Sequence, residues 1–131
     1  MRSSRDIVGW MALGALAVGL LVAQGFALDD VGLPIHPNAI ASSIVRQSGK
    51  GEGTEWVSVT FKTQAPYAKV VRFYRDKTGR HVHISQIDSG KLQNTMILFA
   101  KRPQDQITIN ISSEVGQGVT VVEISRNLVG P

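Results

Sequence analysis

Three histidines are the residues of this 131-residue chain that come closest to the spacing of a metal site. His81 and His83 stand two apart in a stretch, Arg80 to Ile87, that alternates like a strand, so both imidazoles would point to one side. His36 would have to approach from an earlier segment. A catalytic metal usually takes three protein ligands with oriented partners, and spacing alone supplies neither. Solvated strand histidines are the commoner case, and we therefore predict no metal site and no metal-dependent enzyme.

The remaining polar residues form no recognisable catalytic set. The chain has no cysteine, which excludes thiolate chemistry, disulfides and a lipid-modified cysteine. Serines in the expected strands lack a Gly-x-Ser-x-Gly elbow. The carboxylates are scattered through turns and strand ends, and their spacing does not indicate a pair that could act as general acid and general base. These are Glu52, Glu55, Asp88, Asp105, Glu114 and Glu123. We expect neither an enzyme nor a bound cofactor.

A glycine-rich segment at residues 47–54 is the one place where a phosphate-binding loop suggests itself. A loop of the Walker type has four residues between its glycines and then Gly-Lys-Ser/Thr at the start of a helix, whereas this segment leads into a strand. Its closely spaced glycines free the backbone, and nothing apolar holds them. We interpret residues 47–54 as a flexible turn.

The elements that position these residues begin with an uncharged stretch from Ile7 to Leu28, which follows Arg2 and Arg5. About 22 helical residues rise roughly 33 Å, enough to cross a hydrocarbon core of about 30 Å. We therefore predict a membrane anchor over residues 1–28. By the positive-inside rule the two arginines stay in the cytoplasm, which places the rest of the chain on the opposite side of the membrane.

Two fates remain open for this stretch. Gly25-Phe26-Ala27 would serve as a cleavage site, which makes a removed export signal one alternative. The apolar run is longer than most signal cores, and Trp10 and Phe26 lie near its ends as interfacial anchors do; both features favour a retained single-pass helix. Small residues four apart would form a ridge on which another membrane helix packs closely. That ridge consists of Ala15, Gly19, Ala23 and Ala27.

The chain beyond the anchor reads as a linker followed by one domain. Residues 29–39 contain two prolines three apart and are predicted to form an extended linker that spaces the domain from the membrane. The exported domain would occupy residues 40–131. Its first strand is expected at Ile40 to Arg46, and a clearer one at Trp56 to Lys62 alternates apolar and polar residues. Apolar spacings of three and four then predict a helix over about Pro66 to Thr78.

Further strands follow the helix at short intervals. They are predicted at Arg80 to Ile87, Thr95 to Ala100, Ile107 to Ser112 and Val119 to Ser125. The short turns between them favour antiparallel neighbours. The predicted fold class is therefore α+β, with an N-terminal transmembrane helix and an antiparallel sheet of about five or six strands that carries one helix on one face. Because Thr95 to Ala100 is apolar on both faces, we expect that something covers the second face, and a partner would do so.

The predicted helix has a basic outer side. Lys69 and Arg72 lie opposite the apolar stripe, and Arg75 and Arg80 join them toward the end of the helix. This side is a candidate interaction face for anionic headgroups or an acidic protein, although any surface helix needs a charged side. The formal net charge of +4 is modest and widely spread, which does not indicate binding to nucleic acid.

Two short motifs stand before and after the first clear strand. Leu33 to Ala39 reads Leu-Pro-x-x-Pro-x-Ala, and Thr63 to Tyr74 reads Thr-x-x-x-x-x-x-Val-x-x-Phe-Tyr. In these motifs the exported part resembles small exported bacterial domains of unknown function. It departs from them at His36 and Asn38, where an aromatic residue and a glycine are expected. The resemblance implies an envelope location and a helix-on-sheet fold, and it implies no activity.

These observations together predict a noncatalytic, single-pass accessory subunit of a larger bacterial inner-membrane complex, respiratory or photosynthetic for example. Its periplasmic domain would bind protein. The partners would be the lipid bilayer and other membrane-protein subunits, with no nucleic acid. The alternative is a cleaved, soluble periplasmic domain that binds a small ligand or a peptide between its helix and its sheet.

Overall fold

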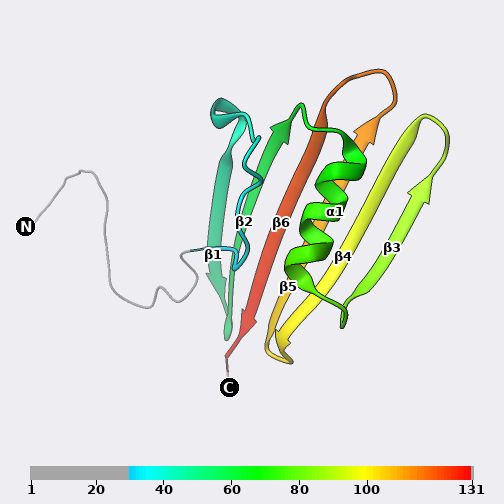
Figure 1. Ribbon diagram of the computed structural model, residues 1–131. Helices are drawn as coiled ribbons and strands as arrows, with labels where there is room; N and C mark the ends of the chain where they lie inside the picture. Colours follow the sequence, from blue (N-terminus) through cyan, green and yellow to red (C-terminus); the bar gives the residue numbers. More distant parts are fainter. Residues whose placement is uncertain (1–29, 131) are drawn as a thin grey trace, which may run out of the picture.

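Residues 30–130, which the computed structural model describes, form one antiparallel sheet of six strands with one helix on one of its faces (Figure 1). The strands lie in the order β1-β2-β6-β5-β4-β3, and every neighbouring pair is antiparallel. The predicted helix on an antiparallel sheet is confirmed, and the number of strands lies within the predicted range.

The elements follow the chain as a hairpin, a helix and a meander. They are η3 (Ala41–Ser43), β1 (Val45–Gly51), β2 (Thr54–Thr63), α1 (Tyr67–Thr78), β3 (His83–Asp88), β4 (Leu92–Arg102), β5 (Asp105–Glu114) and β6 (Thr120–Val129), where η3 is a short 3-10 helix. After the β1–β2 hairpin, α1 carries the chain across the sheet to its far edge. Strands β3 to β6 then return by short turns until β6 pairs with β2. This path leaves β1 and β3 as the two edge strands.

Helix α1 packs on the sheet with the apolar stripe that its sequence predicts. Val70, Val71 and Tyr74 are buried, and Tyr67 and Phe73 are partly buried beside them. They share one hydrophobic core with side chains from every second position of strands β2, β6, β5 and β4, because alternate residues of a strand point to one face. Those core residues are Val57, Val59, Phe61, Ile97, Ile107, Ile109, Ile111, Val122 and Ile124.

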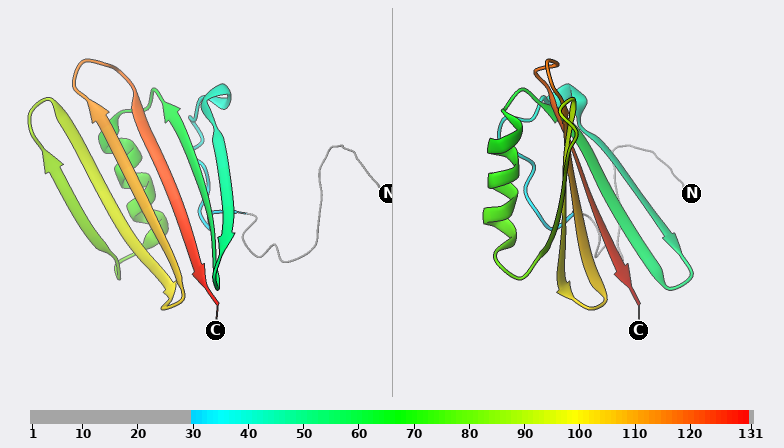
Figure 2. Two further views of the ribbon diagram at one scale, coloured as in Figure 1. Left: turned by 180° about the vertical axis from the view of Figure 1, so that it is seen from behind. Right: turned by 90° about the vertical axis from the view of Figure 1, so that its right-hand side faces the viewer.

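The proline-containing lead-in lies on the same face of the sheet as α1 (Figure 2). Val31 is 2% exposed and belongs to the hydrophobic core, and Leu33 packs against that core. The linker predicted over residues 29–39 is non-helical from Asp30 onward, but it does not space the domain from its surroundings. Its apolar residues cover a part of the sheet beside α1, so the packed domain includes residues before the predicted boundary at residue 40.

The glycine-rich segment predicted as a flexible turn is a strand for most of its length. The first strand begins at Val45, later than predicted, and it pairs with β2 over its whole length, leaving only residues 52–53 as the turn. Gly49 lies opposite Trp56, and a Cβ atom on it would stand 2.6 Å from the indole nitrogen. Gly49 therefore leaves space for the indole ring of Trp56. The segment is held in place by its hydrogen-bonded pairing with β2 and not by apolar side chains of its own.

The face of the sheet that turns away from α1 is covered by no other described element (Figure 2). The strand expected at Thr95 to Ala100 is longer in the structure and alternates as pleating requires. Thr95 and Ile97 are buried toward α1, whereas Leu98, 36% exposed, points to the uncovered face. Both faces of this strand are thus apolar, but within residues 30–130 only one of them is covered.

The predicted anchor over residues 1–28 lies outside the described residues, and so does its ridge of Ala15, Gly19, Ala23 and Ala27. Among residues 30–130, no helix combines the length and the apolar character that crossing a membrane requires.

Candidate interaction surface

A basic groove runs along the flank of α1 that faces the edge strand β3. Two adjoining open hollows of about 420 and 570 Å³ form it, and Arg75 and Asp76 border both. The other lining residues are Tyr67, Ala68, Val71, Arg72 and Gln86 in the first hollow and Gly79, Arg80, Val82 and Ile84 in the second. We call these residues together the α1–β3 groove.

The groove exists because the sheet is wider than the helix. Helix α1 contacts β5 and β4 on the helix-bearing face, and β3 continues that face beyond the helix (Figures 1 and 2). Alternation along β3 turns Ile84 and Gln86 toward the helix side, in register with Ile97 and Thr95 of β4. The side chains of one half-covered strand therefore become the second wall of the groove.

The groove combines positive charge with apolar surface. Arg72, Arg75 and Arg80 are exposed along it, against one lining carboxylate, Asp76. Within residues 30–130, no salt bridge joins these arginines to a carboxylate. A guanidinium offers donors in a planar fork that matches a carboxylate, so the groove suits an anionic group carried on an apolar chain.

The predicted basic side of the helix is divided between its two flanks. Arg72, Arg75 and Arg80 come together in the α1–β3 groove, whereas Lys69 does not line it. Lys69 is exposed and acts electrostatically on His36, which lies in the lead-in. The structure thus gathers three of the four predicted residues in one place.

His36 is a buried histidine on the lead-in side of α1. It is 3% exposed, its ring meets Phe73 edge to face with 4.7 Å between centroids, and the backbone N–H of Asn38 donates to its Nδ1 over 3.1 Å. Burial, and to a smaller extent the charge of Lys69, lower the pKa of His36 below its ordinary value of 6.5. The neutral imidazole is the form that this packing favours.

The three histidines do not converge. His83 is exposed in β3 and lies opposite Leu98, on the uncovered face, whereas His81 precedes the strand and His36 is buried on the helix-bearing face. In the part of the chain that the structure describes, no group of three or more His, Cys, Asp or Glu residues is arranged to hold a metal ion.

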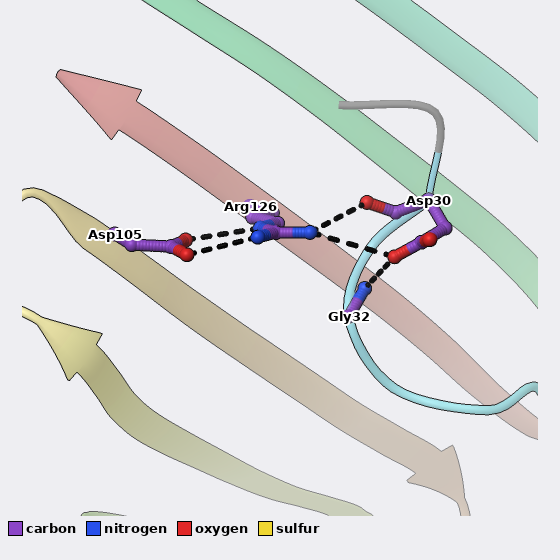
Figure 3. A network of polar contacts seen from close by, with 4 residues as sticks. All are labelled: Asp30, Gly32, Asp105 and Arg126. Atoms are coloured by element: carbon purple, nitrogen blue, oxygen red, sulfur yellow. Dashed lines mark hydrogen bonds and ion pairs between the residues drawn. The ribbon is translucent and has the colours of Figure 1, made fainter. Parts of the chain in front are cut away.

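An ionic network fastens the start of the lead-in to the sheet (Figure 3). Arg126 of β6 donates to both carboxylate oxygens of Asp105 on β5, over 2.9 and 2.8 Å, and to the Asp30 carbonyl over 3.3 Å. A carboxylate oxygen of Asp30 in turn accepts the N–H of Gly32 over 2.7 Å. The guanidinium holds the pKa of Asp105 below its ordinary value. We call Asp30, Asp105 and Arg126 the lead-in clip.

Further hydrogen bonds hold the rest of the lead-in. The hydroxyl of Tyr74 donates to the carbonyl of Pro34 over 2.9 Å, and the hydroxyl of Thr63 donates to the carbonyl of Asn38 over 2.9 Å. These donors come from α1 and β2, so the lead-in is bound to both the helix and the sheet. The flank of α1 opposite the α1–β3 groove is filled by the chain itself.

No family model matches the chain, and no curated protein or solved structure matches it either. The fold class is therefore defined by the structure, as a six-stranded antiparallel sheet with one helix over residues 30–130. The resemblance to exported domains of unknown function stays a prediction.

Sequence reasoning found the arginines of the groove but not its second wall. Val82, Ile84 and Gln86 were predicted as strand residues, and nothing in their spacing indicates that the helix lies next to them. The sequence carries no signal for this wall, because only the strand order of the folded sheet places β3 beside α1.

Proposed function

We propose that this chain is a noncatalytic, membrane-anchored accessory subunit of a bacterial inner-membrane complex, and that its periplasmic domain docks a partner protein in the α1–β3 groove. The main observation behind the proposal is that three arginines and several apolar side chains line one groove, next to an edge strand. Arginine is enriched at protein interfaces, where it contributes both stacking area and paired hydrogen bonds.

The lead-in clip limits the distance between the domain and a retained anchor. The clip begins at Asp30, two residues after the end of the stretch from Ile7 to Leu28 that the sequence predicts as an anchor. A retained anchor would therefore hold the domain next to the bilayer, without a free linker between them. Such confinement raises the effective concentration of the groove toward other proteins of the same membrane.

Site-specific photocrosslinking tests the docking surface. A photoreactive amino acid at position 68, an exposed position in the groove, is expected to crosslink a protein of the membrane fraction, whereas the same group at position 108, on the uncovered face, gives no such product. The product from position 68 should disappear when Arg72 and Arg80 are both changed to Glu. Crosslinking from position 108 alone, or equal products from both positions, would contradict docking in the groove.

The anchor is tested separately by mass and by substitution. An intact amino terminus in the membrane fraction is expected, and a mature chain that starts near Leu28 would instead support the cleaved, soluble alternative. Gly19→Leu should weaken copurification with partner subunits while the exported domain stays folded, because a large side chain interrupts the small-residue ridge. Ala17→Leu, at an apolar position off that ridge, is the matched control, and equal copurification of the two variants would count against ridge docking.

A further inference from the structure

The edge strand β3 has a free side next to the groove. It pairs with β4 from His83 to Asp88 without a break in register, and within residues 30–130 no strand pairs with its other side. Such an edge presents unpaired N–H and C=O groups, which are a template for another strand. The groove therefore ends in a row of backbone donors and acceptors.

The two edges of the sheet differ in how they are protected. Strand β1 carries Arg46 and Lys50, and Lys50 pairs with Glu55 over 3.4 Å. Strand β3 reads His-Ile-Ser-Gln-Ile-Asp: its one carboxylate, Asp88, stands at its end, and it has no lysine, arginine, proline or bulge to discourage pairing. The less protected edge is thus the one beside the arginines.

We propose that an extended acidic segment of a partner protein adds to the sheet as a strand next to β3, with its carboxylates facing the arginines of the α1–β3 groove. This inference rests on the proposed function, because it specifies how the groove holds its partner. Main-chain hydrogen bonds to β3 would supply affinity, and alternate side chains would supply specificity, as in other cases of strand addition.

The side chains on the two sides of β3 determine the pattern of the segment. On the helix side, every second residue of an added strand would reach Arg75 and Arg80, so these residues are acidic. On the other side, the remaining residues would meet Ile87, which is 61% exposed, so these residues are apolar. The segment that fits is one in which acidic and apolar residues alternate.

Charge favours such a partner over a second copy of this chain. Pairing of β3 with β3 of another copy would bring two grooves together, each with three arginines and one carboxylate, and these like charges repel. An acidic segment neutralises the same charges. The self-paired dimer is therefore the alternative that the experiment has to exclude.

Three end-blocked peptides test this mode of binding on the full-length protein in detergent. The probe is an octapeptide of alternating Glu and Val, and its controls are a Lys and Val octapeptide and a Glu and Val octapeptide in which every backbone nitrogen is methylated. We expect the probe to slow hydrogen exchange of β3 amides and leave β1 amides unchanged. Binding should weaken about tenfold or more with Arg75→Glu, with the Lys peptide and with the N-methylated peptide.

Each contrary result overturns a defined part of the inference. Equal binding of the N-methylated peptide would exclude strand addition, and equal binding of the Lys peptide would exclude recognition of acidic residues. If β3 amides become protected as the protein concentration is raised in the absence of peptide, the occupant is a second copy of the chain. Absence of binding by all three peptides would also reject the inference, while a crosslink from position 68 would still uphold docking in the groove.

Discussion

The two flanks of α1 lie on the same face of one sheet, but only one of them is filled by the chain. On the filled flank, the lead-in packs against helix and sheet, and Val31 and His36 are buried in it. On the open flank, the space between α1 and β3 is bordered by exposed arginines. The filled flank shows that this face accepts an extended segment beside the helix, which is the kind of ligand that we propose for the open flank.

The two flanks also differ in the energetics of their polar groups. The lead-in is held by groups that are buried or nearly so, and loss of a partner leaves such groups unsatisfied at a high cost. The arginines of the open flank are solvated, and solvated charges contribute little to folding. Substitutions on the filled flank should therefore change stability, and substitutions on the open flank should change binding.

The largest effect is expected for Arg126→Ala, which breaks the lead-in clip. Asp105, whose side chain is 3% exposed, would remain buried without its partner, and the free energy of unfolding should fall by about 3 kcal/mol. Urea denaturation measures this loss. Asp30→Asn is the control, because the Asp30 side chain is 73% exposed and should cost less than about 1 kcal/mol. Similar losses for both variants would show that the buried pair is not what holds the lead-in.

Gly32→Ala comes next, because it strains the lead-in at its contact with the sheet. Gly32 has a φ of 79°, and a Cβ there would stand 2.9 Å from the Cδ1 of Ile107, so we expect a loss of about 2 kcal/mol. The matched control is Gly90→Ala in the turn after β3, where φ is 87° and nothing lies within 4 Å of the new atom. It should cost about 1 kcal/mol, from backbone strain alone. Equal melting temperatures for the two variants would contradict close packing at Gly32.

Tyr74→Phe should have a smaller effect, since it removes one hydrogen bond and keeps the ring. The carbonyl of Pro34 would lose its donor, and the free energy of unfolding should fall by about 1 kcal/mol. Hydrogen exchange should show the loss as faster opening of the lead-in and leave β3 unchanged. An unaltered lead-in would mean that the hydroxyl does not fasten it.

The pH dependence of stability gives a finer test on the same flank. Because the pKa of His36 is lowered in the folded state, the unfolded chain takes up a proton first as the pH falls below about 6.5, and stability decreases there. Above that pH the imidazole is neutral in both the folded and the unfolded state, so His36 no longer makes stability depend on pH. His36→Gln should remove this decrease, as followed by urea midpoints between pH 7 and 5. The same slope in the variant would assign it to another group.

Local sequence patterns predicted the elements of this fold better than the contacts between them. The spacing of Val70, Val71 and Tyr74 defines the helix and its buried side, because a helix that packs on a sheet needs an apolar stripe. The lead-in clip has no such pattern, since Asp30 and Arg126 stand 96 positions apart. The packing of the lead-in against the sheet was likewise not predicted. Its prolines indicate a stiff backbone, but they do not indicate which surface that segment packs against.

For the same reason, only the helix wall of the groove could be predicted from the sequence. Helical periodicity places Arg72 and Arg75 on a solvated side, but only the strand order puts β3 beside them. The prediction for β1 was wrong because its glycines indicated a turn. Pairing with β2 and the space required by Trp56 make the segment a strand. In both places, pairing between distant strands determined the structure more strongly than local composition did.

The smallest effect on stability is expected for the double variant Arg72→Glu and Arg75→Glu on the open flank. Both side chains are exposed, and within residues 30–130 neither forms a salt bridge, so the free energy of unfolding should fall by less than about 1 kcal/mol, chiefly because Arg75 is a cation in the last turn of α1. Binding of the Glu and Val octapeptide should nevertheless be lost, because two charges in the groove have changed sign. A variant that unfolds easily would show that these arginines stabilise the fold, and the two flanks would then not divide stability from binding. A stable variant that still binds the peptide would place the docking surface elsewhere on the sheet.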